Sequence, residues 1–348
     1  MADFADIYGQ EQIREHMQYA LRTDKVSHAY IIAGASGAGK KLLSGIFAKA
    51  LLCEKRSEKE GMIEACNECP SCIKALSGSH PDIITVTHEK ENSIGVDDIR
   101  SKLCDDVVTK PYESTRKIYI LPEAEKMTAQ AQNALLKTLE EPPSYIVIII
   151  PTNNVNALLP TILSRCIILP TKPVKDDVIK SFLMQKYRVV DYKAELSAAF
   201  ARGNIGKALE LSSNERFEKL KNETIDLISR VQNLNTAEIM DRIHVLLEPA
   251  EEDAKSSKKG VDMGQYEDFM DILYFLFRDF LVFKSTQSDS HLIFTDKVSY
   301  ISSVTKKCSY EGINCILEAM DTAKKRISSN VNMDLALELM FLSIKENL

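Results

Sequence analysis

The sequence predicts an α/β fold in which a parallel sheet lies between helices, followed by an all-helical region. Up to residue 170, short apolar segments alternate with longer segments whose apolar residues recur at helical spacing. This alternation is typical of a parallel sheet that helices cover on both faces. After Pro170 and Pro173 the strand-like segments stop, and the remaining apolar patterns are helical.

The elements of the α/β part can be expected in chain order. Apolar residues at helical spacing predict helices over residues 10–22, 40–52, 96–108 and 129–139. Short apolar runs predict buried strands over residues 29–33, 83–86, 117–121, 145–150 and 167–169. The first of these runs leads into a glycine-rich loop, and a helix follows the loop. This order of strand, loop and helix is the context in which phosphate-binding loops occur.

The second part of the chain is predicted to be helical throughout. Three short amphipathic segments, over residues 176–187, 193–201 and 205–211, predict a small helical domain. From about residue 214 the pattern stays helical, with strong amphipathic segments over residues 266–284, 311–327 and 334–344. No internal repeat interrupts it.

Composition places the chain among ordinary folded proteins. Its 348 residues are 45% hydrophobic and 27% charged, which allows a substantial core and two or three domains. The net charge of −6 argues against a protein that coats nucleic acid. The N-terminal residues lack a signal-peptide pattern, and the apolar run over residues 146–150 is too short to cross a bilayer. We therefore expect a cytoplasmic protein that does not contact membranes.

Residues 34–41 read GASGAGKK, which matches the phosphate-binding pattern G-x-x-x-x-G-K-[ST] except at its last position. In this pattern, backbone N–H groups and the helix N-terminus bind phosphate oxygens, and the lysine neutralises their charge. The candidate binding residues are Gly34, Gly37, Gly39, Lys40 and Lys41. Lys41 stands where a Ser or Thr hydroxyl would ligate Mg²⁺, and an ammonium group cannot ligate a cation.

A second expected Mg²⁺ ligand is also missing. An Asp should end the buried strand over residues 117–121, and Pro122 stands at that position. Glu123 follows, where a carboxylate could polarise an attacking water, although a solvated carboxylate at a strand end is an equally good interpretation. Two losses in separate motifs indicate an NTPase fold that has lost its own hydrolysis and has kept another role.

Four cysteines are spaced as metal ligands. Cys66, Cys69 and Cys72 form a C-x₂-C-x₂-C run, with Cys53 upstream. In a reducing compartment this set suits a structural, tetrahedral Zn²⁺ site. Free thiols and an iron–sulfur cluster are the alternatives; exposed thiols would oxidise, and the short loop beside a helix end favours zinc. The remaining cysteines are too scattered for a second site.

Arg165 lies shortly after the strand-like run over residues 145–150. An arginine near the end of a sheet can project onto a phosphate that a neighbouring subunit binds, and can stabilise charge on the γ-phosphoryl group. On the residues alone, a surface salt bridge is an equally good interpretation. His28 and His80 stand alone, and we expect them to serve packing or hydrogen bonding.

Together these motifs resemble the AAA+ proteins of the bacterial DNA polymerase III clamp loader. The resemblance covers residues 1 to about 215, whereas the C-terminal third matches in length and helical character only. It is carried by Gly9-Gln10, His28-Ala29-Tyr30, the loop over residues 34–41, the cysteine cluster, the run AQNALLKTLEEPP over residues 131–143, and residues 158–166.

The resemblance implies a P-loop AAA+ core over residues 1–170, with a zinc-binding insertion at about 53–75. It implies an all-α lid over residues 171–213 and an all-α collar for oligomerisation over residues 214–348. The expected partners in DNA replication are the motor subunits (gamma/tau) and the delta subunit in a hetero-pentamer, the sliding clamp, and primer–template DNA through the assembly. The resemblance also implies that Arg165 is an arginine finger acting in trans, and that the cysteines hold structural Zn²⁺.

Three departures from the family pattern indicate its non-motor, delta prime type of subunit. Motor subunits carry a Ser or Thr, an Asp and a lid Arg where this chain has Lys41, Pro122 and Gly206. We therefore expect that the chain alone does not turn over ATP. We also expect it to be part of a DNA-directed DNA polymerase (nucleotidyltransferase) holoenzyme. Because Lys207 lies one residue out of register with the missing Arg, binding of ATP or ADP in this site stays open.

Two other functions are alternatives to this one. An ATP-hydrolysing motor subunit of the gamma/tau type would need the three residues that are missing. A zinc-dependent DNA-binding module would need a basic run beside the cysteine loop, and the sequence has none there.

Overall fold

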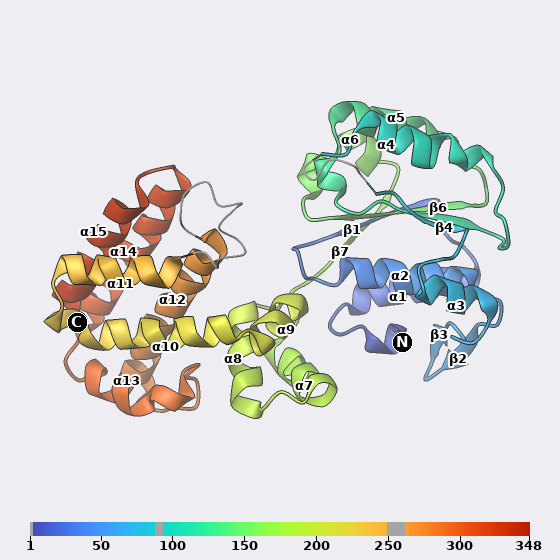
Figure 1. The fold of residues 1–348 in the computed structure, drawn as a ribbon. Helices are drawn as coiled ribbons and strands as arrows, with labels where there is room; N and C mark the ends of the chain where they lie inside the picture. The colour runs from blue at the N-terminus through green and yellow to red at the C-terminus, as the bar shows by residue number, and fades with distance from the viewer. Residues whose placement is uncertain (1–2, 88–92, 249–261) are drawn as a thin grey trace. The chain divides into compact units, whose positions relative to one another are not determined.

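The computed structural model describes residues 3–87, 93–248 and 262–348 of the chain (Figure 1). The chain forms two compact units, Met1–Arg188 with Ala201–Leu209, and Val189–Phe200 with Glu210–Leu348. The three-part division at residues 170 and 213 stays a prediction. Within the described ranges, no helix combines the length and the apolar character that crossing a membrane requires.

The first unit is built on a five-stranded sheet with the strand order β4-β5-β6-β1-β7. Its strands are β1 (Ala29–Ala33), β4 (Ile83–Thr85), β5 (Lys117–Ile120), β6 (Ile146–Thr152) and β7 (Ile167–Pro170). Every pairing is parallel; Ile31 of β1, for example, lies opposite Ile150 of β6 and Ile168 of β7. Strands β1 and β6 are buried along their whole length, which explains their continuous apolar sequence. The predicted parallel sheet is confirmed.

Helices cover both faces of this sheet (Figure 1). One face carries α1 (Glu11–Thr23), α2 (Lys40–Leu52) and α3 (Pro70–Leu76), and the other carries α4 (Val96–Ile99), α5 (Ala129–Glu140) and α6 (Pro160–Leu163). Alternate residues of β1 serve the two apolar cores: Tyr30 packs with Phe47 of α2, while Ile31 belongs to the core that contains Leu135 of α5.

The segment over residues 96–108 is not the single helix that its pattern predicts. It consists of α4, a π-helical turn over Arg100–Cys104 and a 3₁₀ turn over Asp106–Val108. The buried ammonium of Lys117 pairs with the Asp106 carboxylate at 2.8 Å and donates to the Asp106 carbonyl at 3.1 Å. The Tyr119 hydroxyl donates to the same carboxylate at 2.9 Å. These bonds to β5 hold Asp106 out of a regular helix.

Three short helices follow the sheet in the chain, and the helices after them form a bundle in the second unit. The short helices are α7 (Asp176–Tyr187), α8 (Asp191–Ala201) and α9 (Ile205–Ser213). The bundle helices are α10 (Glu215–Arg230), α11 (Thr236–Leu247), α12 (Met263–Thr286), α13 (Val298–Thr305), α14 (Tyr310–Ser328) and α15 (Met333–Asn347). Helix α12 buries Phe269, Phe277 and Phe280 completely, and Phe269 stacks on Phe341 of α15. The predicted helical character of this region is confirmed.

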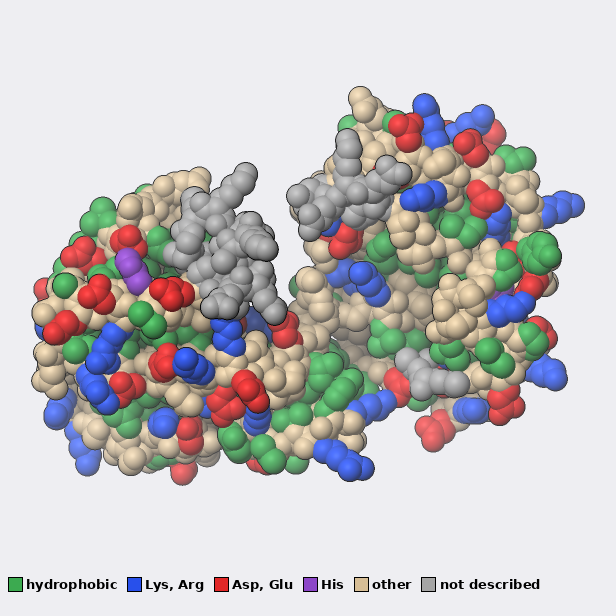
Figure 2. Space-filling model, in the orientation of Figure 1, with side chains coloured by type: hydrophobic (Ala, Val, Ile, Leu, Met, Phe, Trp, Pro, Cys, Tyr) green, Lys and Arg blue, Asp and Glu red, His purple; other side chains and the backbone are tan. Residues whose placement is uncertain are grey.

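Charged side chains of both signs are interspersed over the face of each unit that Figure 2 shows. This mixture agrees with the net charge of −6. A protein that binds nucleic acid by itself usually gathers lysine and arginine on one face. The face drawn in Figure 2 therefore gives no support to a DNA-binding module.

Candidate functional site

The glycine-rich loop connects β1 to α2 and borders a cavity of about 390 Å³. Gly37 and Gly39 have φ angles of 80° and 82°, a left-handed backbone that favours glycine. Gly39 is also the residue before the first turn of α2. Because the first N–H groups of a helix have no partner within it, this end of α2 suits an anion. The structure thus places the predicted loop in the predicted context.

Lys40 is bound by three oxygen atoms of its own chain. Its Nζ atom donates to the carbonyls of Gly34 at 2.7 Å and Ala35 at 2.6 Å, and to Oδ1 of Asn153 at 2.8 Å. Burial lowers the pKa of the Lys40 ammonium, and the charge of Glu125 opposes that change. The ammonium is therefore held inside the loop.

Glu125 orients the asparagine that contacts Lys40. Its carboxylate accepts the Asn153 backbone N–H at 3.0 Å and the Asn153 side-chain amide at 2.6 Å. The Thr152 hydroxyl donates to it at 2.9 Å. Burial raises the pKa of Glu125, but the hydrogen bonds from these donors lower it by a larger amount. The net pKa therefore lies below its usual value. An ionised carboxylate, an amide and an ammonium thus form one chain of hydrogen bonds.

The two departures from the metal-binding pattern lie on the same cavity. Lys41, Pro122 and Glu123 all line it, together with Lys40 and Asn153. Glu123 has a left-handed φ of 55° and pairs with Lys126 at 2.9 Å. Because an ammonium and a pyrrolidine ring stand at the two expected Mg²⁺-ligand positions, the residues present do not fit a site for Mg²⁺-assisted hydrolysis.

A turn before α9 closes on the glycine-rich loop. The Asn204 side-chain amide donates to the Ser36 carbonyl at 2.5 Å, and the Gly206 N–H donates to the Gly37 carbonyl at 3.1 Å. A Cβ atom on Gly206 would lie 2.6 Å from that Gly37 oxygen and 2.8 Å from the Gly37 Cα. Gly206, where a lid arginine was expected in a motor, is therefore in direct backbone contact with the loop.

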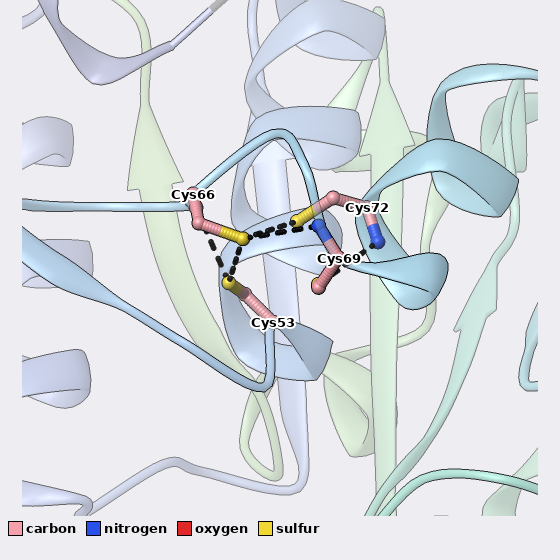
Figure 3. Close-up of side chains that lie close together, drawn as sticks. All are labelled: Cys53, Cys66, Cys69 and Cys72. Atoms are coloured by element: carbon pink, nitrogen blue, oxygen red, sulfur yellow. Dashed lines mark hydrogen bonds between the residues drawn. The ribbon is translucent and has the colours of Figure 1, made fainter.

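The four predicted cysteine ligands converge (Figure 3). Their sulfur atoms all lie within 4.8 Å of one another. The sulfur of Cys66 is 3.6 Å from that of Cys53 and 4.0 Å from that of Cys72. These distances are too long for a disulfide, and they match the separation of about 3.8 Å in a tetrahedral zinc–thiolate site with Zn–S bonds of about 2.3 Å. The cluster fits a metal ion with four sulfur ligands and no open position.

Backbone N–H groups donate hydrogen bonds to the sulfur atoms of Cys53, Cys66 and Cys69. The N–H of Cys66 donates to Cys53 Sγ at 3.3 Å, and the N–H of Cys69 donates to Cys66 Sγ at 3.3 Å. The N–H of Cys72 donates to Cys69 Sγ at 3.4 Å. Backbone hydrogen bonds lower the pKa of the Cys66 thiol to about 6, and the bond from the Glu68 backbone has the largest effect. Burial raises the pKa of the Cys72 thiol.

The cysteine loop is fastened to the N-terminal segment and to α2. Asn67, between the first two cysteines of the run, has a left-handed φ of 61°. Its side chain accepts from Lys49 Nζ at 2.6 Å and donates to the Asp3 carboxylate at 2.8 Å. Lys49 also pairs with Asp3 at 2.7 Å, and its side chain is only 4% exposed. A hairpin of β2 (Ser57–Lys59) and β3 (Met62–Glu64) fills the insertion between Cys53 and Cys66.

His80 supports the cysteine loop through hydrogen bonds. Its Nδ1 accepts the Asp82 backbone N–H at 3.0 Å, so the neutral ring carries its proton on Nε2, which lies 3.0 Å from Ser71 Oγ. Ser71 in turn donates to the Leu52 carbonyl at 2.9 Å. The Ser71 hydroxyl proton is donated to the Leu52 carbonyl, and the acceptor nitrogen of His80 is occupied by the Asp82 N–H. The two residues therefore cannot act as the serine and histidine of a nucleophilic triad. The hydrogen-bonding role predicted for His80 is confirmed. Among the described residues, the Nε2 atom of His28 is buried without a hydrogen-bond partner.

Arg165 lies at the surface between α6 and β7, and its side chain is 34% exposed. Its Nη2 pairs with Glu140 at 2.8 Å, and its Nη1 donates to the Thr161 carbonyl at 2.8 Å and to Ser164 Oγ at 3.3 Å. Burial raises the pKa of the thiol of Cys166, the next residue, to about 12, so this thiol stays neutral. Arg165 is not among the residues that line the cavity beside its own phosphate loop.

Four residues of these sites are not predicted from the sequence: Asn153, Glu125, Asn204 and Glu140. A signal existed for Asn153, because it directly follows β6, the neighbour of β1 in the sheet. Ligands in parallel sheets bind beyond the carboxyl ends of the strands, so a polar residue at that position is a candidate. The other three act across long stretches of sequence, and no local pattern marks them.

Two family models match the chain. The model described as "DNA polymerase III, delta subunit" matches residues 9–175, and the model described as "DNA polymerase III, delta subunit, C terminal" matches residues 238–346. The first match contains the glycine-rich loop, the four cysteines and Arg165. The second lies within the helical bundle.

Curated relatives carry related names. DNA polymerase III subunit delta′ of Bacillus subtilis is 29% identical over 338 residues, which is 97% of this chain and 96% of the relative. DNA polymerase III subunit tau of the same species is 31% identical over 81% of this chain, but this chain spans only 50% of it. A solved DNA polymerase III gamma subunit-related protein from Thermotoga maritima aligns with 95% of this chain and 99% of its own, at 21% identity and a TM-score of 0.44.

Proposed function

The chain belongs to the DNA polymerase III delta subunit family of clamp-loader proteins, and we propose that it works there as a non-motor subunit of the delta prime type. In this role it helps load the sliding clamp onto primed DNA during replication, and it completes the ATP site of a neighbouring motor subunit through Arg165. One observation carries the proposal: Lys41 and Pro122 stand together on the cavity beside an otherwise intact phosphate loop.

The loss of hydrolysis in this chain's own site follows from charge. A Mg²⁺ ion normally bridges the β- and γ-phosphates and neutralises the charge that develops during transfer. Neither Lys41 nor Pro122 offers an oxygen ligand to such an ion. Lys40, the lysine that the pattern itself specifies, is held by Gly34, Ala35 and Asn153. Backbone N–H groups remain for an anion, so weak binding of ATP or ADP is compatible with the loop, whereas turnover is not.

Arg165 is suited to act on a neighbour. Its guanidinium is fixed by three hydrogen bonds and is still one-third exposed. A guanidinium beside a γ-phosphate stabilises the charge of the transition state, so it accelerates hydrolysis more than it strengthens nucleotide binding. We therefore assign Arg165 the role of an arginine finger in trans.

The cysteine cluster is proposed to hold one structural Zn²⁺ ion. Cys53, Cys66, Cys69 and Cys72 would be its ligands, and four thiolates leave no position for a substrate. The ion would join the end of α2, the hairpin β2–β3 and the start of α3. No chemical step is assigned to it.

The partners proposed for the chain come from the names of its relatives and from the resemblance in sequence. They are the motor subunits (gamma/tau) and a delta subunit in a hetero-pentamer, the sliding clamp, and primer–template DNA reached through the assembly. The motor alternative is disfavoured, because the delta′ relative matches along its whole length while the tau relative matches over half of its own.

The decisive variant is Arg165→Ala in an assembly reconstituted from all subunits. In P-loop NTPases such an arginine is worth about 10³–10⁵ in rate, so the adjoining ATP site should lose nearly all of its hydrolysis. Arg22→Ala is a matched control, because Arg22 also contacts a glutamate, Glu58, and a backbone carbonyl, that of Gly61. Unchanged hydrolysis at the adjoining site in the Arg165 variant would contradict the proposal.

A further inference from the structure

The partner that holds Arg165 comes from a different helix. Glu140 is the last residue of α5, while Arg165 follows α6. The Nη2 atom of Arg165 lies 2.8 Å from Glu140 Oε1. This bond joins two conspicuous segments of the sequence, the run over residues 131–143 and Ser164-Arg165-Cys166.

The geometry leaves part of the guanidinium open. An arginine has five N–H donors in a fixed plane. Within the described chain, one donor on Nη2 goes to Glu140, and the two on Nη1 go to Thr161 and Ser164. Two donors remain for an acceptor outside the chain, and about a third of the side chain is exposed. The guanidinium is thus held in one orientation by three of its N–H donors, and it keeps two donors for another acceptor.

The location of Glu140 indicates that it serves this contact. A carboxylate at the C-terminal end of a helix faces the negative end of the helix dipole, which disfavours it. A cation at the same place is favoured, both by the dipole and by the carboxylate. Glu140 is therefore placed to hold a cation from another element, and Arg165 is that cation.

We propose that Glu140 is the positioning residue for Arg165, fixing the guanidinium so that it meets the phosphate of a neighbouring subunit without reordering. This inference deepens the arginine-finger role and rests on it. An exposed pair has little net electrostatic energy, and the Glu140 side chain is 50% exposed, so the carboxylate does not cancel the finger's charge. Its effect is geometric: an arginine already held in one rotamer loses less freedom when it binds.

The test uses the reconstituted assembly with motor subunits that lack their own arginine fingers, so that only the site completed by this chain hydrolyses ATP. Glu140→Ala should lower kcat about three- to tenfold and leave KM for ATP unchanged, because the finger acts in the transition state. Glu140→Gln keeps an oxygen acceptor and should retain most of the rate. Glu141→Ala, at the next exposed residue, is the matched control and should have no effect.

A double-mutant comparison separates positioning from a general structural effect. In an Arg165→Ala background, Glu140→Ala should cause no further loss, because the two residues act as one unit. An equal loss in both backgrounds, an unchanged kcat, or a raised kcat in Glu140→Ala would overturn the inference. Failure of the proposed function would look different, since Arg165→Ala itself would then leave hydrolysis intact.

Discussion

The backbone N–H of Gly206 lies 3.1 Å from the carbonyl oxygen of Gly37, and no side chain fits between them. A motor subunit is expected to carry an arginine at this lid position, aimed at bound phosphate. Here the same position makes a backbone hydrogen bond to the phosphate loop itself. The missing arginine and the closed turn are therefore one structural feature.

Substitution of Gly206 tests this contact. We expect Gly206→Ala to lower the free energy of unfolding by about 1–3 kcal/mol, because its Cβ would lie 2.6 Å from the Gly37 oxygen and force the backbones apart. Gly45→Ala is the matched control: Gly45 is in the middle of α2 with nothing within 4 Å of a new Cβ. That change should be neutral or stabilising by up to about 1 kcal/mol. Denaturant unfolding measures both, and equal effects would contradict the contact.

Metal removal tests the cysteine site. Purified protein should contain about one zinc ion per chain, and a chelator should lower its Tm, because the ion joins α2, the hairpin and α3. Cys69→Ser should reduce the zinc content, whereas the exposed Cys315→Ser should leave it unchanged. Absence of zinc from protein prepared without chelator, or iron in its place, would show that the assignment is wrong.

Lys49 links the cysteine loop to the N-terminal segment, and its removal should be costly. In Lys49→Met the stem remains, but Asp3 and Asn67 lose their shared partner in a largely buried place. We expect a loss of about 1–3 kcal/mol in unfolding free energy and faster release of zinc to a chelator. Lys59→Met, on the exposed strand β2, is the control. Zinc release at the wild-type rate in Lys49→Met would contradict the link.

Asp82 should make part of the stability depend on acid pH. Burial raises the pKa of its carboxyl, but the backbone N–H groups of Tyr112, Glu113 and Ser114 lower it more, so the net pKa lies below its usual value. The unfolded chain, with an Asp pKa of about 3.9, then binds the proton more readily than the folded one. The stabilisation is complete above about pH 4 and is lost as the pH falls through the folded pKa.

The measurement for Asp82 is the unfolding free energy of the protein and of Asp82→Asn between pH 3 and pH 7. The difference between them should shrink as the pH falls below about 4, because the wild-type carboxylate is then protonated. Asp97→Asn, at an exposed position in the first turn of α4, provides the comparison. A difference that stays constant down to pH 3 would mean that the Asp82 charge contributes nothing.

The sequence predicts the buried strands well, because β1 and residues 146–151 of β6 are uninterrupted apolar runs, and such runs are typical of strands covered on both faces. It does not reveal the hairpin β2–β3, because the residues of β2 are polar and exposed. Nor does it reveal the break after α4, which depends on bonds from Lys117 and Tyr119, more than ten residues away.

The candidate site likewise contains residues that the sequence predicts and contacts that it does not. The cysteines and the glycine-rich loop could be found because their ligands are close in sequence and their spacing is set by chemistry. The Lys40–Asn153 bond joins residues 113 positions apart, and the Asn204–Ser36 bond joins residues 168 positions apart. Contacts of this length follow from the fold and cannot be read from a local pattern.

We propose, above all, that this chain hydrolyses no ATP itself and completes the ATP site of a neighbouring subunit. The most direct measurement is steady-state ATPase activity with primed DNA and sliding clamp, for this chain alone, for the motor subunits alone, and for both together. We predict no turnover by the chain alone and stimulation in the mixture, with the stimulation lost in Arg165→Ala. Turnover by the isolated chain would show that Lys41 and Pro122 permit hydrolysis, and would identify the chain as a motor.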